Sequence, residues 1–138
     1  MALRAAIVLA ALLLALPAAA GTAPLRSKTF RTPSRNIACA VYVIEGVPDL
    51  RCDVLSGLRP EPSRRCDGDW TGASMRPRGR AGAVCAGDTV YDPRAPVLAY
   101  GRTWERSGFR CRSRHTGLTC ANRSKHGFLL ARERWRLF

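Results

Sequence analysis

The chain has 138 residues, of which 23 are Lys or Arg and 10 are Asp or Glu, so its formal net charge is +13. This length fits one domain. Arginine supplies 21 of the 23 basic residues. A GC-rich genome produces part of such an excess, so the charge by itself does not identify a partner.

The first twenty residues have the organisation of a secretory signal peptide. Arg4 precedes an apolar run over residues 5–16, Pro17 interrupts the run, and three alanines follow. We therefore expect cleavage after Ala20. A membrane anchor is the alternative, but the run is shorter than the roughly 20 apolar residues that span a bilayer. The predicted product is a secreted or periplasmic monomer without a membrane span, with a loose lead-in at residues 21–29 and a disulfide-stabilised domain at residues 30–138.

Residues 36–54 predict a β-hairpin. Ile37, Cys39 and Val41 alternate along one strand, and a second alternating strand follows a turn at residues 44–47 that contains a glycine. Placing Cys39 opposite Cys52 brings the inward residues together as Val41 with Leu50 and Ile37 with Val54. A shift by one residue would mix the apolar and polar faces, so the register is well specified.

The middle of the chain carries weaker signals. Residues 58–80 are rich in Pro, Gly and Arg and predict irregular structure, tethered by Cys66 and anchored by Trp70. Residues 81–92 predict a strand, a turn at Gly87-Asp88 and a second short strand. Residues 96–104 predict another strand.

A second cysteine hairpin is expected at residues 108–122. Pairing Cys111 with Cys120 places Ser113 opposite Leu118, around a turn at residues 114–117 that Gly117 closes. Residues 127–138 begin like a strand and end either as strand or as a helical turn. The whole pattern predicts an all-β fold, a small antiparallel sheet that forms a partly closed barrel or a sandwich.

Six cysteines in a small exported chain indicate three disulfides. The two hairpin registers predict Cys39–Cys52 and Cys111–Cys120, and elimination leaves Cys66–Cys85. Two cysteines and two histidines within residues 108–128 raise the alternative of a zinc site. Neither cysteine pair has the close spacing of a zinc knuckle, so we expect no metal and no other cofactor.

Several segments together resemble a known family. They are FRTPSRNIACAV, LRCDV, CDGDW, CAGDTV, LAYGRTW, GFRC, GLTCAN and HGFLLAR. Their order and spacing are similar to those of an uncharacterised family of small bacterial secreted proteins, a domain of unknown function, over residues 30–138. That family's first motif usually reads Pro-Ser-Gly-Asn-Ile, and Arg35 stands at the glycine. The resemblance implies an exported, cysteine-containing domain, and it implies no activity, substrate or catalytic residue.

Catalytic interpretations have few residues to draw on. His115 and His126, with Lys125, could perform acid–base cleavage in a small secreted hydrolase of the nuclease type. The ordinary interpretation is that one histidine is a turn residue and the other begins a strand. Carboxylates at Asp67, Asp69 and Asp88 could serve a glycosidase or bind calcium, but each lies beside a glycine and is typical of a turn. With every cysteine paired, no thiolate nucleophile remains, and we expect no enzymatic activity.

The charge distribution favours binding. Residues 102–138 contain 10 basic and 2 acidic residues. Because Cys111 points inward, Arg110, Arg112 and Arg114 point outward in a row, and Arg123 and Lys125 follow. Guanidinium groups suit phosphate and carboxylate partners. The sequence therefore predicts a non-catalytic binding module at the cell envelope for an anionic polymer or acidic protein. The alternatives are the hydrolase and an inhibitor of a secreted enzyme, and like charge disfavours a basic lysozyme as its target.

Overall fold

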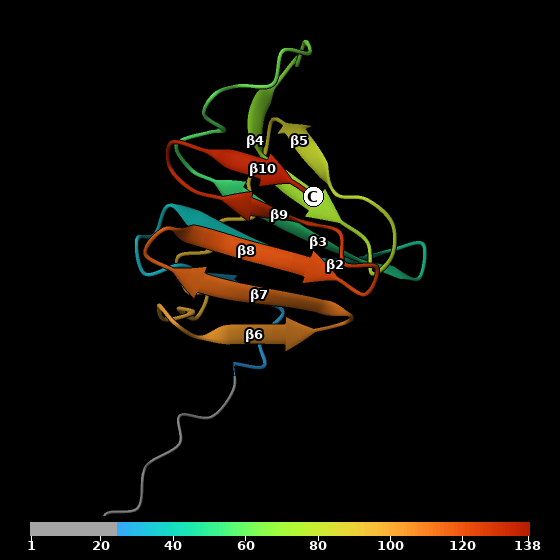
Figure 1. The fold of residues 1–138 in the computed structure, drawn as a ribbon, viewed down its shortest axis with the longest axis vertical. Coiled ribbons are helices and arrows are strands. Elements are labelled where there is room, and N and C mark those ends of the chain that lie inside the picture. The colour runs from blue at the N-terminus through green and yellow to red at the C-terminus, as the bar shows by residue number, and fades with distance from the viewer. Residues whose placement is uncertain (1–24) are drawn as a thin grey trace, which may run out of the picture.

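The computed structural model describes residues 25–138. The predicted signal peptide, its cleavage site and residues 21–24 lie outside the described residues. Within residues 25–138 there are ten β-strands and no helix, arranged as two antiparallel sheets of five strands each. Figure 1 shows the second sheet in front of the first. The expected all-β fold is confirmed, and its two open sheets are those of a sandwich.

Each sheet is a meander in which every strand pairs with the next one along the chain. The first sheet contains β1 (Thr29–Arg31), β2 (Ile37–Ile44), β3 (Val47–Val54), β4 (Asp69–Met75) and β5 (Gly82–Ala86). The second contains β6 (Thr103–Arg106), β7 (Phe109–Arg114), β8 (Gly117–Asn122), β9 (Gly127–Leu130) and β10 (Trp135–Leu137).

Both cysteine hairpins form in the expected register. In β2 and β3, Cys39 lies opposite Cys52, and Val41 lies opposite Leu50. In β7 and β8, Cys111 lies opposite Cys120. The structure contains three disulfides, which join Cys39 to Cys52, Cys66 to Cys85 and Cys111 to Cys120. The two cross-strand pairs have Cα–Cα distances of 4.1 and 4.0 Å, slightly below the usual range because the cysteines face each other directly.

Three expectations for the rest of the chain need correction. Residues 69–75, expected to be irregular, form β4. No second strand follows the bend at Gly87-Asp88. Of residues 96–104, Val97 forms a single bridge to Arg31 of β1, and only Thr103 and Trp104 belong to a strand, as the start of β6. The tail, for which strand and helical turn both stayed open, forms two strands, β9 and β10. These segments owe their structure to long-range partners, which local patterns do not record.

The core lies between the sheets and is built from both. Phe30 on β1 and Trp104 on β6 are fully buried, and their ring centroids are 4.9 Å apart. This aromatic contact joins the two sheets at one edge of the sandwich. Residues 25–28, within the expected lead-in, are attached to the same region. Trp104 Nε1 donates to the carbonyl oxygen of Ser27 at 2.9 Å. The amide of Val41 donates to the carbonyl oxygen of Lys28 at 2.9 Å.

The two sheets repeat one arrangement. An aromatic residue lies opposite the first cysteine of each hairpin, Phe30 in the first sheet and Trp104 in the second. A glycine on the next strand packs against the second cysteine in each. A Cβ at Gly72 or at Gly127 would lie 1.9 Å from the carbonyl oxygen of Cys52 or Cys120. Each half of the chain is therefore the same five-strand unit, which allows position-by-position comparison of the two outer faces.

Candidate functional site

The outer face of the first sheet is covered by the chain itself. Residues 88–98, which we call the strap, cross this face between β5 and β6. Val90 is buried on the strap, and Ala38 and Ala40 are buried beneath it on β2. Small side chains on β2 leave room for the strap to lie close to the sheet.

A buried carboxylate and two arginines hold the strap down. Asp53 on β3 is 1% exposed and accepts from Arg51 Nε at 2.9 Å and Nη2 at 3.0 Å. It also accepts from Thr71 Oγ1 at 3.1 Å and from the amide of Val90 at 2.9 Å. Arg51 in turn donates from Nη1 to Asp88 Oδ1 at 2.9 Å. On β1, Arg31 Nε donates to the carbonyl oxygen of Ala95 at 3.0 Å.

These contacts shift the ionisation of the strap's anchors. Burial alone lowers the pKa of Arg51, but hydrogen bonds and charge from Asp53 and Asp88 outweigh burial and raise that pKa above its ordinary value. The hydrogen bond and charge of Arg51 hold the pKa of Asp88 below its ordinary value. Both anchors are therefore ionised at neutral pH.

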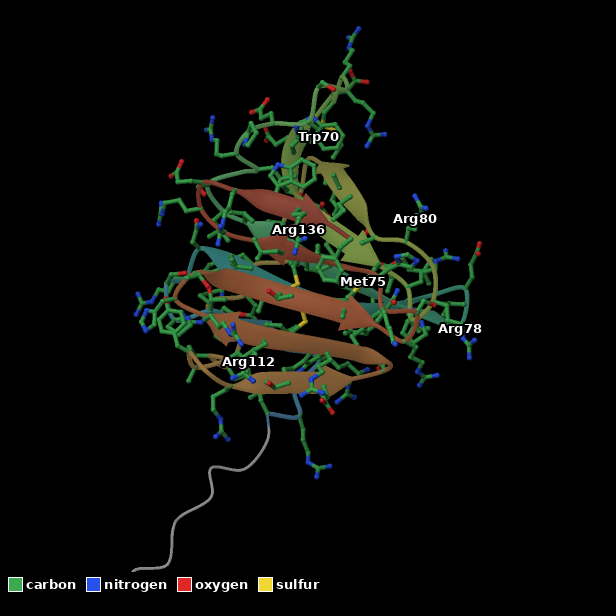
Figure 2. All side chains as sticks on the ribbon, in the orientation of Figure 1. Trp70, Met75, Arg78, Arg80, Arg112 and Arg136 are labelled. Carbon is green, nitrogen blue, oxygen red and sulfur yellow. A yellow bond between two sulfur atoms is a disulfide. The ribbon has the colours of Figure 1, made fainter. Side chains whose placement is uncertain are left out.

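The outer face of the second sheet is uncovered, and no segment of residues 25–138 crosses it (Figure 1). Arg110, Arg112 and Arg114 on β7 are exposed on this face. Cross-strand pairing adds a fourth arginine, because Arg112 is opposite Thr119, Thr119 opposite Leu129, and Leu129 opposite Arg136. Paired residues point to the same side of a sheet. Arg136 on β10 therefore faces the same way as Arg112 (Figure 2).

The arginines border a shallow trough. Small side chains, Thr119 and Ala121 on β8, lie beside the three arginines of β7, and together these five residues line a hollow of about 290 Å³. Glu105 on β6 pairs with Arg110, with Arg110 Nε 3.2 Å from Glu105 Oε1. Both side chains are more than half exposed, and such surface pairs contribute only about 0–1 kcal/mol. An anionic ligand could displace Glu105 at little cost.

Arg123 and Lys125 lie at one end of this sheet, in the turn between β8 and β9. Arg123 borders a surface hollow with Arg110 and Glu105. Lys125 is exposed and has a φ of 63°. The turn is fixed by Asn122, whose side-chain oxygen accepts from the amides of Ser124 and His126. Arg123 is therefore next to the predicted row, and no contact joins Lys125 to that row within residues 25–138.

The two histidines are not brought together. His115 lies in the turn before β8, and His126 follows β8, so the whole strand Gly117–Asn122 separates them. A six-residue strand extends about 20 Å. His126 Nδ1 is 3.3 Å from the main-chain oxygen of Phe138. The nuclease-like alternative required both rings at one substrate position, and this geometry gives it no support.

The candidate carboxylates lie in two places, on the surface and at a cleft. Asp67 pairs with Arg65 on the surface at 3.2 Å. Asp69 and Asp88 border a cleft of about 470 Å³ next to Trp70. Arg51 lowers the pKa of Asp88, so Asp88 is not suited to be the general acid of a glycosidase. Among residues 25–138, no cluster of three His, Cys, Asp or Glu side chains could hold a metal ion, and no helix could span a membrane.

Comparison with known proteins identifies a family for this chain. The model of a family of unknown function (DUF6636) matches residues 8–138. The chain belongs to this family. Neither the curated proteins nor the solved structures gave a match. The resemblance seen in the sequence is thus supported as membership of an uncharacterised family, while its individual motifs and bacterial origin stay predictions.

Sequence reasoning missed two features of this family member's surface. Arg136 was missed because the pattern of residues 131–138 did not distinguish strand from helix. The strap was missed because residues 81–104 were expected to add strands. A usable signal was present: Ala38 and Ala40 alternate with inward residues on β2, and two small outward side chains are typical of a face that another segment covers.

Proposed function

We propose that this chain is an exported, non-catalytic binding domain at the cell envelope, and that the uncovered face of its second sheet binds an extended anionic partner. The observation that carries the proposal is the difference between two equivalent faces. The first sheet uses Arg31 and Arg51 to hold an extended segment of the chain itself. The second sheet presents arginines on β7 and β10 with Thr119, Ala121 and Leu129 between them, and no segment of residues 25–138 lies on it.

The charges of the second face support an anionic partner. Arg112, Arg114 and Arg136 make no ion pair within residues 25–138, and Arg110 has only the exposed pair with Glu105. Arginine presents a planar set of donors that binds carboxylate or phosphate groups in pairs of hydrogen bonds. A partner chain lying over β8 and β9 would have guanidinium groups on both sides, from β7 and from β10.

Export is part of this proposal. It is supported by the organisation of residues 1–20 and by three disulfides, which form and persist in oxidising compartments outside the cytoplasm. The anionic partner could be an acidic secreted enzyme. Binding of such an enzyme to this face would then inhibit it.

The test is binding of the mature domain to immobilised poly-L-glutamate as ionic strength rises. Affinity should fall steeply between about 50 and about 500 mM salt, because salt screens exposed charges over a shorter distance. The triple variant R110S/R112S/R114S should bind about tenfold to a hundredfold more weakly, at roughly 0.5–1 kcal/mol per exposed charge. Its fold should be unchanged, since the three side chains point away from the core.

A charge-matched control separates the face from net charge. The variant R65S/R78S/R94S removes three exposed arginines that lie off this face; Figure 2 labels Arg78 at the side of the sandwich. It should bind like the parent protein. Equal weakening in the two triple variants would show that binding follows net charge alone, and unchanged binding in R110S/R112S/R114S would place the site elsewhere.

A further inference from the structure

A second polar hollow adjoins the arginine trough at the end of the sandwich where β7 turns into β8. Four separate segments line it: the loop of residues 32–37, Tyr100, the turn of residues 114–117, and residues 131–132. Its volume is about 140 Å³. That is enough for an ionic group of several atoms, because one water molecule needs roughly 10–15 Å³ of such space.

The lining of this hollow is cationic. Arg114, His115 and Arg132 contribute two guanidinium groups and one imidazole, and none of the lining residues is acidic. An anion entering the hollow would therefore meet only neutral or positive groups, which is the condition for favourable electrostatics.

The donors in the hollow divide into two groups. Thr32 and Asn36 are committed to the protein, because Thr32 Oγ1 donates to the carbonyl oxygen of Ile37 at 3.3 Å and Asn36 Nδ2 donates to Ser56 Oγ at 3.2 Å. The side chains of Arg114, His115 and Arg132 make no hydrogen bond or ion pair within residues 25–138. Their donors are free for a ligand.

One of these donors is held in place. The rings of His115 and Tyr100 stack with their centroids 3.8 Å apart and an interplanar angle of 34°. The stack fixes the imidazole at the wall of the hollow even though the turn around it is exposed. A positioned donor loses less conformational entropy when it binds than a freely rotating one.

We propose that this hollow is an oxyanion pocket that binds a phosphate group carried by the anionic chain in the trough. A phosphate presents several acceptor oxygens at once, which suits two guanidinium forks and an imidazole approaching from different segments. Arg114 borders both the trough and the pocket, so a chain in the trough would bring its phosphate to Arg114. The inference rests on the proposed function for the identity of that chain, but the pocket itself is testable alone.

The experiment titrates inorganic phosphate into the ¹⁵N-labelled mature domain at constant ionic strength, with sodium acetate as a parallel titration. Saturable shifts are expected for the amides of Ser34, His115 and Gly117. Acetate should bind more weakly, since it offers two oxygens. Arg132→Gln should weaken phosphate binding by about tenfold or more, the effect of losing a hydrogen bond to a charged group. Arg134→Gln, which changes an exposed arginine in the same loop outside the pocket, is the matched control and should bind like the parent protein.

Non-saturable shifts, equal binding of acetate, or equal weakening by Arg134→Gln would each overturn the pocket. The double variant R110S/R112S distinguishes this proposal from the previous one, because it removes trough arginines and leaves the pocket lining intact. Phosphate binding should persist in it. If poly-L-glutamate does not bind but phosphate saturates the pocket, only the proposed trough ligand is wrong. If poly-L-glutamate binds and phosphate does not, only the pocket is wrong.

Discussion

Removing the carboxylate of Asp53 should release the strap and cost a large part of the protein's stability. In Asp53→Ala the buried amide of Val90 loses its acceptor, at about 1–3 kcal/mol for an unsatisfied buried donor. Arg51 loses both of its hydrogen bonds to Asp53, and breaking a buried ion pair typically costs about 3–5 kcal/mol. Arg51 keeps Asp88 and is 16% exposed, so we expect a total near about 3–5 kcal/mol rather than the full sum.

The measurement is urea unfolding with the disulfides intact, together with amide hydrogen exchange at Val90. A loss of about 3–5 kcal/mol would be a third or more of the stability of a typical small domain. Exchange at Val90 should accelerate more than exchange in the core strands, because the strap opens before the sandwich does. Asp67→Asn is the control; it removes an exposed ion pair with Arg65 that lies outside the strap and should leave exchange at Val90 nearly unchanged.

A loss below about 1 kcal/mol in Asp53→Ala would refute this reasoning. It would mean that water replaces the carboxylate without cost, and hence that Asp53 does not anchor the strap. Unchanged exchange at Val90 in a destabilised variant would equally contradict it, because the destabilisation would then come from the sheet and not from the strap.

The remaining predictions concern packing, pH and processing. Gly127→Ala should destabilise the domain by about 3 kcal/mol or more in urea unfolding, because the new Cβ would overlap the carbonyl oxygen of Cys120 and the backbone would have to move. A smaller loss of stability would show that β9 adjusts freely. Burial raises the pKa of Asp49, and the charge of Arg76 only partly opposes it. A raised pKa means that the ionised form of Asp49 disfavours the folded state, so Asp49→Asn should be more stable than the parent protein at pH 7. The difference in stability should vanish as the pH falls below the ordinary pKa of aspartate. An Asp49→Asn variant that is less stable than the parent at pH 7 would contradict this sign. Amino-terminal sequencing of the exported protein should begin at or near Gly21, and a membrane-bound product that retains Met1 would show an uncleaved anchor instead.

The sequence was sufficient where neighbours in the chain are also neighbours in the sheet. The register of β2 with β3 follows from alternation alone, because only one pairing puts Cys39, Val41 and Ile37 on a common apolar face. The same reasoning placed Cys111 opposite Cys120. In both hairpins the partner strand begins only a few residues after the first ends, so the pattern contains both halves of the contact.

The sequence was insufficient where the neighbouring strand is distant in the chain or where the residues are weak strand formers. β4 reads Asp-Trp-Thr-Gly-Ala-Ser-Met, and its Asp, Gly and Ser are poor strand residues. It forms because β3 and β5 lie on either side and because Gly72 permits close approach to Cys52. The polar hollow could not be found locally at all, since its lining comes from four segments that only the completed sandwich brings together.

At position 35 the structure explains how arginine can replace the glycine that the resemblance predicts. The resemblance noted in the sequence predicts a glycine there, and in this chain Arg35 has a φ of 59°. That is the left-handed region, which glycine adopts without steric cost and other residues adopt at a cost of about 1–2 kcal/mol. The amide of Arg35 donates to the carbonyl oxygen of Thr32 at 2.9 Å, so the turn keeps its shape with arginine in place.

The positions and contacts of the arginines on the two outer faces argue against a purely compositional origin for the basic face of the second sheet. A genomic bias toward arginine acts on both halves of the chain alike, and both outer faces do carry arginines. On the first sheet, Arg31 and Arg51 each bind the strap through hydrogen bonds. On the second sheet the positions equivalent to Arg51 and Asp53 are Thr119 and Ala121, which cannot anchor a strap in that way. The arginines there stand instead on β7 and β10, with Thr119, Ala121 and Leu129 between them. This placement offers no anchor to an internal segment, and it is the one that the proposed external anionic chain requires.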